Sequence, residues 1–305
     1  MTYKVLSHGR VKWTNITKPT SADMERLREA YPHFHPLDLE DCLSHLERPK
    51  IDEYDDYLFI VMQFPQWDAA SRVSRPAEVD MFIGSGFFVT VHSGELKPLV
   101  NFFREASQDP SVREHYMRRG AGRLMHTVVD QLVDYVFPLL YKVDANIRAI
   151  ENEIFTEDAR QIVQEISIVR RDIIALRRII RPQLAILANL EDVDRPFIHE
   201  DLDVYFGDIL DHMTKARDIV EDDAEVIAGL ADTTDTLASY RINEVMRILT
   251  VISVIMLPLT LISGIYGMNV PLPFKDHQGS FFGIMGLMLL ISIGMLLYFR
   301  HRRWL

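Results

Sequence analysis

Oxygen-bearing and small side chains recur at steps of three and four residues over a long stretch of the sequence, which places them on one face of a helix. The stripe is acidic at first and mostly neutral afterwards: its members are Asp211, Asp218, Glu221, Glu225, Asp232, Asp235, Ser239, Asn243, Met246, Thr250, Ser253, Leu257, Thr260, Gly264 and Gly267. Carboxylates attract divalent cations, whereas hydroxyl, amide and backbone oxygens can contact a cation's water shell without trapping the ion by charge. Mg2+ gives up its water reluctantly and prefers oxygen ligands. The stripe therefore predicts a path for hydrated divalent cations, with Asp232 and Asp235 as metal ligands near its entrance.

Several residues of the stripe have a second interpretation that involves no ion. Thr250 and Ser253 can hydrogen-bond to their own helix backbone or fill contacts between helices. Gly264 and Gly267 equally suit points of close helix packing, and the acidic residues 221–223 equally suit a solvated helix face.

Two uncharged stretches near the C-terminus are long enough to cross a bilayer. One is the 27 residues between Arg247 and Lys275, and the other covers residues 281–299. A helix of about 20 residues spans a hydrocarbon core of ~30 Å. The motif Tyr266-Gly267-Met268-Asn269 lies at the end of the first apolar run, so we expect a tight break between two spanning helices there.

The C-terminal end, Arg300-His301-Arg302-Arg303-Trp304-Leu305, predicts the topology because positive residues beside a span favour the cytoplasmic side. Two spans return the chain to the side on which it began, and the first 15 residues contain no apolar run of signal-peptide length. We therefore expect a multi-pass protein of the cell (inner or plasma) membrane, in contact with lipid. Both termini are expected in the cytoplasm, and the loop at Asn269 outside.

Composition narrows the function classes. The 305 residues include 44 acidic and 33 basic side chains, a formal net charge of -11, which argues against a nucleic-acid partner because phosphate binding needs clustered Lys and Arg. The single cysteine, Cys42, excludes a disulfide framework and a thiolate metal cluster. No nucleophile, base or cofactor motif stands out, so the sequence does not predict an enzyme.

The first part of the chain has the pattern of a mixed α/β structure. Residues 57–62 form a dense apolar, β-prone run typical of a buried strand, and residues 79–91 predict a hairpin with a glycine turn at 84–86. Helical patterns cover residues 24–30 and 37–46.

Long helices dominate the second part. Apolar residues repeat at steps of three and four over residues 124–155 and 159–190, and Pro182 should kink or end the second of these helices. If residues 208–269 form one helix, it is a rod of roughly 90 Å.

These patterns predict an α+β protein with three parts: a cytoplasmic α/β domain (1–123), a helical stalk domain (124–247) whose last helix continues into the first span, and a transmembrane domain (248–305). The two spans are expected at about residues 248–268 and 281–299.

At the Tyr266-Gly267-Met268-Asn269 motif, followed by a second span and a basic ending, the chain resembles the CorA magnesium channels. The resemblance extends to residues 243–250 and 257–265 and, near the N-terminus, to residues 39–42 and 48–50. It implies a homopentamer shaped as a funnel, with a cytoplasmic α/β domain, one long stalk helix per subunit and a pore lined by the first span.

The resemblance also implies roles for single residues, with Mg2+ as both transported and regulatory ion. Gly267, Met268 and Asn269 would form the selectivity filter, and Asn269 would hold a hydrated ion. Asn243, Leu249, Leu257 and Thr260 fall on positions that line or constrict the pore. Asp232 would bind regulatory Mg2+ between subunits, with Asp68 of the neighbour as its acidic partner. The basic collar would consist of Arg300, Arg302 and Arg303.

One segment departs from the family pattern. Relatives commonly carry an acidic residue in a Met-Pro-Glu stretch soon after the motif, whereas residues 270–277 offer Asp276, beside Lys275 and further along the chain. Recruitment of cations by charge at the outer mouth is therefore weakened. His277 in the same loop raises the prospect of Co2+, Ni2+ or Zn2+, which imidazole suits.

We thus expect a passive channel that carries hydrated Mg2+, with Co2+ and Ni2+ as candidate further ions. Intracellular Mg2+ is expected to close it by binding between subunits. The alternative is a zinc transporter of the same superfamily, with or without proton coupling. A two-span sensor or scaffold is a third interpretation and predicts no ion flux.

Overall fold

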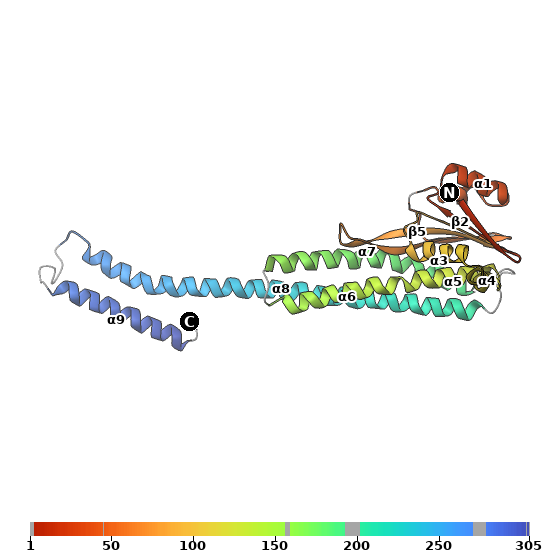
Figure 1. The fold of residues 1–305 in the computed structure, drawn as a ribbon. Helices are drawn as coiled ribbons and strands as arrows, with labels where there is room; N and C mark the ends of the chain where they lie inside the picture. Colours follow the sequence, from red (N-terminus) through yellow and green to blue (C-terminus); the bar gives the residue numbers. More distant parts are fainter. Residues whose placement is uncertain are drawn as a thin grey trace. The chain divides into compact units, whose positions relative to one another are not determined.

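The protein divides into two compact units, Met1–Ala231 and Asp232–Leu305. A computed structural model describes residues 3–44, 46–155, 159–192, 202–270, 279–302 and 304. The first unit contains a sheet with helices on both faces, and the second contains two long apolar helical segments (Figure 1). The boundaries predicted at 123/124 and 247/248 stay a prediction.

The sheet has six strands in the order β1-β2-β6-β5-β4-β3. Their bounds are β1 (Tyr3–His8), β2 (Val11–Thr17), β3 (Lys50–Glu53), β4 (Tyr57–Asp68), β5 (Val73–Gly84) and β6 (Phe87–His92). Among these strands β2 and β6 pair in parallel, and the other neighbours in the described sheet pair antiparallel. The predicted strand at 57–62 and the predicted hairpin are confirmed as β4 and as β5–β6. Gly86 in the hairpin turn has φ +79°, and a Cβ there would lie 2.9 Å from the Arg10 carbonyl oxygen, so the turn requires glycine.

Helices cover both faces of this sheet because its side chains alternate between them. Tyr57, Phe59 and Val61 of β4 pack with α1 (Ser21–Ala30) and α2 (Pro36–Asp41) in one buried cluster. The intervening residues Leu58 and Ile60 are equally buried toward the opposite face.

That opposite face contacts the long helices and the shorter helices next to them (Figure 1). The elements are α3 (Lys97–Gln108), α4 (Pro110–Met117), α5 (Ala121–Asp134), α6 (Val136–Glu153) and α7 (Ala159–Asp192). Two side chains of α7 accept hydrogen bonds from strand N–H groups: Gln183 from Gln63 at 3.3 Å and Asp172 from Ser74 at 2.6 Å.

Three predicted helices differ in detail. The helix expected at 37–46 is the short α2, and the helix expected at 124–155 is two helices, α5 and α6, that meet at Tyr135. Pro138 explains this division, because it has no N–H to donate to the carbonyl of Asp134. Pro182 does not end α7, which continues to Asp192. In the turn of α7 that contains Pro182, the side-chain Nε2 of Gln183 donates to the Ile179 carbonyl at 3.0 Å.

The long helix expected at 208–269 is confirmed as α8 (Asp203–Tyr266), which begins in the first unit and ends in the second. In the first unit its buried residues recur at steps of three and four: they are Phe206, Ile209, Met213, Ala216 and Val220. This periodicity buries one stripe of a helix against a core. The predicted second span is confirmed as the apolar helix α9 (Ser280–His301).

Candidate functional site

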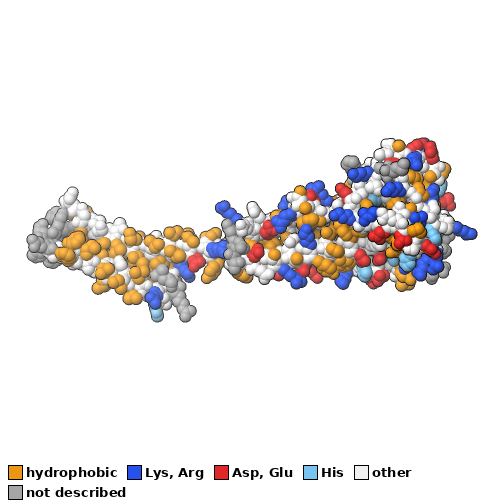
Figure 2. Space-filling model, viewed as in Figure 1, with side chains coloured by type: hydrophobic (Ala, Val, Ile, Leu, Met, Phe, Trp, Pro, Cys, Tyr) orange, Lys and Arg blue, Asp and Glu red, His pale blue; other side chains and the backbone are white. Residues whose placement is uncertain are grey.

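The last third of α8 carries most of the residues predicted to line an ion path, and all of them are exposed in the single chain. Exposed positions are Asn243, Met246, Leu249, Thr250, Ser253, Leu257, Thr260, Gly264, Gly267, Met268 and Asn269. Large apolar side chains beside them are exposed as well, such as Ile252, Leu261 and Ile265. Figure 2 shows this apolar surface along the second unit. Both α8 and α9 are long and apolar enough to cross a membrane.

A hollow of about 670 Å3 follows one face of α8 near its C-terminal end. Ser253, Leu257, Thr260 and Gly264, all predicted pore residues, line it together with Met268. Steps of three and four residues bring these side chains onto one face, and the small residues Ser253 and Gly264 leave the hollow open. The structure therefore brings this part of the predicted stripe into one continuous concave strip.

The hydroxyl groups on this face have a defined orientation. Thr250 Oγ1 donates to the Met246 carbonyl at 2.7 Å, and Thr260 Oγ1 donates to the Met256 carbonyl at 2.8 Å. These hydrogen bonds agree with the interpretation of the threonines as bonded to their own backbone. Each of these bonds uses the hydrogen of the hydroxyl group. The lone pairs of the oxygen can still accept a hydrogen bond. The bonds are thus compatible with contact to the hydrogens of an ion's water shell.

The Tyr266-Gly267-Met268-Asn269 motif coincides with the end of α8. The Gly267 N–H donates to the Ser263 carbonyl at 2.9 Å, and the Met268 N–H donates to the Ile265 carbonyl at 3.2 Å, which closes the last turn. A Cβ on Gly267 would lie 3.1 Å from the Ser263 carbonyl oxygen, tighter than ordinary contact. Asn269 follows this turn and is exposed. Asp276 and His277 lie outside the described residues.

The three predicted acidic ligands differ in their surroundings. Asp232 and Asp235 are exposed on α8 in the second unit. Asp68, at the end of β4, is engaged within its own turn: it accepts hydrogen bonds from Ser71 Oγ at 2.7 Å and from the Ala70 N–H at 3.0 Å. These two bonds, and the Arg75 guanidinium 2.5 Å away, lower the pKa of the Asp68 carboxyl. A cation would have to compete with these groups for Asp68.

The acidic residues 221–223 are only partly a solvated face. Glu221 forms an ion pair with Arg177 of α7. Asp223 is buried, 8% exposed, and its Oδ2 has no hydrogen-bond partner among the described residues. Burial and the nearby carboxylates of Asp144 and Asp222 raise the pKa of Asp223 to about 6. The pattern of charges alone did not reveal this burial, because α6 lies far from α8 in the sequence.

A second group of side chains that could hold a metal ion was missed by the sequence analysis. Asp130 and Asp134 of α5 and His212 of α8 offer ligand atoms that all lie within 4.8 Å of one another. His212 Nδ1 is 3.7 Å from Asp134 Oδ1 and has no hydrogen-bond partner among the described groups. Burial, and secondly the charge of Asp134, raise the pKa of Asp130. Two carboxylates and an imidazole are a donor set that suits Zn2+, Co2+ or Ni2+, and the carboxylates also suit Mg2+.

The sequence alone could have indicated two members of this group, but not the third. Asp130 and Asp134 are four residues apart in a predicted helix, a spacing that places both on one face. His212 lies 78 residues further along the chain than Asp134. Only the packing of α8 beside α5 brings it to them.

The basic residues after the second span lie around the end of α9. Arg300 and Arg302 are exposed, and the Arg302 guanidinium lies 6.0 Å from the centre of the Tyr298 ring. Trp304 packs on Phe299 with ring centres 5.8 Å apart. Arg303, the third predicted member of the basic collar, lies outside the described residues.

Comparison with known proteins decides the family. Residues 8–302 match the family described as CorA-like Mg2+ transporter protein. The chain belongs to the CorA family. It is 34% identical to the putative metal ion transporter YfjQ of Bacillus subtilis over 96% of this chain and 89% of that protein. It is 30% identical to the cobalt/magnesium transport protein CorA of Thermotoga maritima over 96% of this chain and 83% of that protein.

A solved CorA structure has the same fold. The complete CorA magnesium transporter of Methanocaldococcus jannaschii superposes with a TM-score of 0.87 at 20% identity, over 98% of this chain and 94% of that one. The CorA match and the two apolar helices identify this protein as a divalent metal ion transporter of the membrane, and not an enzyme. The predicted family and its monomer architecture are therefore confirmed.

Proposed function

We propose that this CorA protein is a passive channel for hydrated Mg2+, and secondarily for Co2+ and Ni2+. The observation that carries the proposal is the concave strip on α8, where Ser253, Thr260 and Gly264 lie in one hollow among apolar side chains such as Leu257 and Leu261. A hydrated divalent cation presents only hydrogens to its surroundings. Oxygen lone pairs on this strip match those hydrogens without the cost of removing the ion's water.

A closed path needs several copies of the strip. In one chain Thr260 and Leu257 are exposed, so a single helix offers one wall only. Identical helices around an axis would bury these walls against one another and leave Ile252, which does not line the hollow, for lipid or for neighbouring helices. We propose five copies, a number that comes from the family resemblance, arranged as a funnel with the first unit and both termini in the cytoplasm.

The outer mouth in this arrangement is the motif after α8. Gly267 permits the close turn over Ser263, and Met268 and Asn269 follow it with exposed side chains. The Asn269 side-chain oxygen would accept from the first water shell of an entering ion. Since an amide carries no net charge, it would hold the ion weakly enough for release.

Gating by intracellular Mg2+ is the second part of the proposal. Asp232 and Asp235 would form acidic rings around the axis, and like charges brought together cost free energy unless a cation lies between them. Bound Mg2+, with Asp68 of a neighbouring subunit as a partner of Asp232, would hold the helices together and the path closed. The cluster Asp130–Asp134–His212 offers a further cation site in the same unit as Asp68.

The transport proposal is tested by ion flux into liposomes that contain the purified protein. Wild type should admit Mg2+ without an added energy source, and Asn269→Ala should reduce the flux at least about tenfold. Asn243→Ala, on the same face but at the other end of the predicted path, should act more weakly. Absence of Mg2+ flux in the wild type, with flux of another ion, would reject Mg2+ as the cargo.

The gating proposal has its own test. Asp232→Lys should leave flux high when Mg2+ inside the liposome is raised, whereas wild-type flux should fall. Equal inhibition of both proteins by internal Mg2+ would remove Asp232 from the gate. Asp203→Lys, exposed on α8 but outside the acidic stripe, is the control for charge alone.

A zinc transporter, with or without proton coupling, is the alternative that one observation favours. Imidazole is a better ligand for Zn2+ than for Mg2+, and His212 faces two carboxylates. Flux of Mg2+, Co2+, Ni2+ and Zn2+ measured in parallel, with and without a pH gradient, separates the two functions. Zinc flux that depends on the gradient, without Mg2+ flux, would support the alternative.

A further inference from the structure

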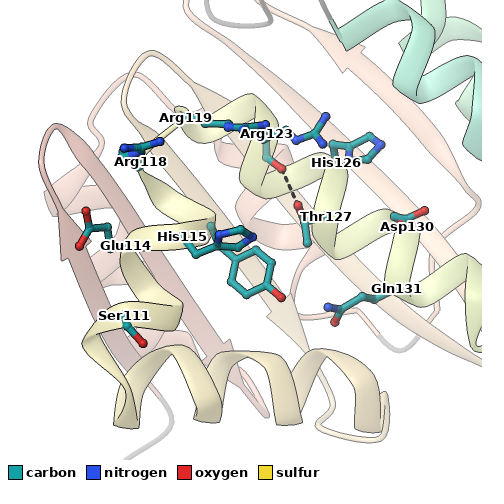
Figure 3. A pocket seen from close by; sticks show the side chains of 11 residues that line it. Ser111, Glu114, His115, Arg118, Arg119, Arg123, His126, Thr127, Asp130 and Gln131 are labelled. Carbon is teal, nitrogen blue, oxygen red and sulfur yellow. Dashed lines mark hydrogen bonds between the residues drawn. The ribbon is translucent and has the colours of Figure 1, made fainter.

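A pocket of about 560 Å3 lies at the junction of α4 and α5, within the first unit. Arg118, Arg119 and Arg123 line it, and Figure 3 shows their side chains in a row along one margin. The volume falls in the range of small-molecule sites, roughly 300–1,000 Å3. Such a basic group is unexpected in a chain with a net charge of -11.

One of these arginines, Arg123, lies at the positive end of a helix dipole. Helix α5 begins at Ala121, so Arg123 lies in its first turn, whereas Arg118 is the C-cap of α4, a helix end that favours a cation. The N-terminal end of a helix carries a partial positive charge, which repels cations and attracts anions. Helix α5 has neither an acidic residue in its first turn nor a side-chain cap on Gly120. A bound anion would supply the missing negative charge.

The guanidinium groups are also available for a ligand. None of the three arginines forms an ion pair with a carboxylate in the part of the chain that the structure describes. Arg123 is held in place by Tyr205, since its guanidinium lies 3.9 Å from the centre of that ring. His126 in turn holds Tyr205, as its Nε2 donates to the Tyr205 carbonyl at 3.3 Å. A stacked guanidinium keeps its N–H edge free for bidentate hydrogen bonds to a phosphate.

The other charged groups of the pocket limit the size and kind of anion. Two carboxylates, Glu114 and Asp130, lie toward opposite ends of the row in Figure 3, away from its middle. Burial and the charge of Arg123 lower the pKa of His126, so this imidazole is neutral at pH 7 and adds no charge. Tyr116 adds an aromatic ring to the lining. The pocket thus offers several separated positive groups in line beside one aromatic surface.

We propose that this pocket binds an oligophosphate chain, as carried by a nucleoside triphosphate or by inorganic triphosphate. Several guanidinium groups in a row match successive phosphates better than they match a single compact anion. The inference concerns a ligand of the soluble part, and it stands whether or not the proposed ion path is correct.

Calorimetric titration of the full chain in detergent tests the inference, with ATP and inorganic triphosphate as separate ligands and EDTA present to remove divalent cations. Wild type should bind at least one of the two. Arg118→Gln/Arg119→Gln should weaken binding at least about tenfold, because two charge-assisted hydrogen-bonding groups are lost. The matched control is Arg10→Gln/Arg48→Gln, which removes the same charge from exposed positions outside the pocket and should change affinity less than about twofold.

The two ligands distinguish the source of the phosphate chain. Equal binding of ATP and triphosphate supports recognition of the chain alone, and tighter binding of ATP supports a nucleotide that also contacts the aromatic lining. Binding of neither ligand, or equal weakening in the pocket variant and the control variant, overturns the proposal.

Hydrogen exchange of the wild type gives a measurement that depends on no variant. ATP or triphosphate should slow exchange in residues 111–131. Protection confined to other segments would place the ligand elsewhere and likewise overturn the proposal.

Discussion

The two units treat the same kinds of side chain in opposite ways. Leu58 and Ile60 in β4 are 0% exposed, whereas Leu257 of α8 is 69% exposed and Leu290 of α9 is 70% exposed. The first unit therefore finds partners for its apolar side chains within one chain. The second unit leaves them for lipid and for other copies, as expected of a membrane segment, where lipid replaces a packed core.

Polar groups show the same difference. In the first unit Asp38 is buried and accepts hydrogen bonds from Tyr57 OH at 2.8 Å and Tyr54 OH at 3.1 Å. Along the apolar part of α8, Thr250 and Thr260 bond only to their own backbone as far as the structure describes them, and Asn243 is exposed. The carboxylate of Asp38 is thus satisfied by folding, although Asp223 Oδ2 in the same unit is buried without a partner among the described residues. The polar groups of the second unit remain available for an ion or a partner subunit.

The largest effect should come from a matched pair of leucine truncations. Leu58→Ala should lower the free energy of unfolding by about 2–5 kcal/mol, since it leaves a cavity in a packed core. Leu290→Ala, at an exposed site, should cost less than about 1 kcal/mol in detergent. Denaturant titration followed by tryptophan fluorescence measures both. An equal cost for Leu290→Ala would show that this face of α9 is packed against protein.

A buried histidine should make the first unit sensitive to acid. His92 donates from Nε2 to Asn15 Oδ1 at 3.1 Å and accepts at Nδ1 from the Gly94 N–H at 3.0 Å, so a second proton has no place. Burial lowers the pKa of His92 to about 4. Between this value and the ordinary 6.5, the unfolded chain binds more protons than the folded one. The contribution of neutral His92 to the free energy of unfolding is therefore full above pH 6.5 and is lost as the pH falls toward 4.

The acid sensitivity caused by His92 should be large enough to measure in the free energy of unfolding. The shift corresponds to at most about 3 kcal/mol between pH 7 and pH 4. Unfolding free energies measured at pH 7 and pH 5 should differ less in His92→Gln than in wild type. The same change at His8, on the edge strand β1, should leave the difference as it is. An unchanged pH dependence in His92→Gln would assign the acid sensitivity to other groups.

The hydroxyl lone pairs on α8 can be removed at constant size. Thr260→Val should reduce Mg2+ flux roughly tenfold, because the path loses hydroxyl acceptors for the ion's water shell at a combined cost of about 1.4 kcal/mol. Thr236 makes the same bond to its helix, from Oγ1 to the Asp232 carbonyl at 2.9 Å, and lies outside the hollow. Thr236→Val should leave flux within about twofold of wild type. Equal losses in both variants would attribute the effect to the helix rather than to the path.

Sequence reasoning succeeded where the signal is local. The run at 57–62 and the glycine turn predicted β4 and the β5–β6 hairpin, and the absence of proline between residues 201 and 258 predicted one long helix. The shared face of Ser253, Leu257, Thr260 and Gly264 was likewise readable, because the spacing of residues along one helix defines its faces; their role as an ion path stays a prediction.

It failed where the outcome depends on distant segments. Nothing near Asp130 indicates that His212 lies beside it, and nothing near Asp223 indicates its burial. The arginines Arg118, Arg119 and Arg123 were not singled out from the sequence, because the helix start at Ala121 and the pocket beside it appear only in the structure. The interruption at Tyr135 has a local cause in Pro138 and could have been predicted.

The smallest effect concerns an ion pair that joins the strand layer to the helices of the first unit. Arg72, between β4 and β5, donates to both carboxylate oxygens of Glu165 on α7, at 2.8 Å and 2.6 Å. Both side chains are more than a third exposed, so water screens the attraction. A double-mutant cycle with Arg72→Ala and Glu165→Ala should give a coupling of about 0.2–1 kcal/mol in unfolding free energy, which falls in high salt. A coupling of several kcal/mol that is insensitive to salt would mean that the pair is buried in the assembly. Part of the first unit would then be completed by a neighbouring chain, and the first unit could no longer be described as complete within one chain.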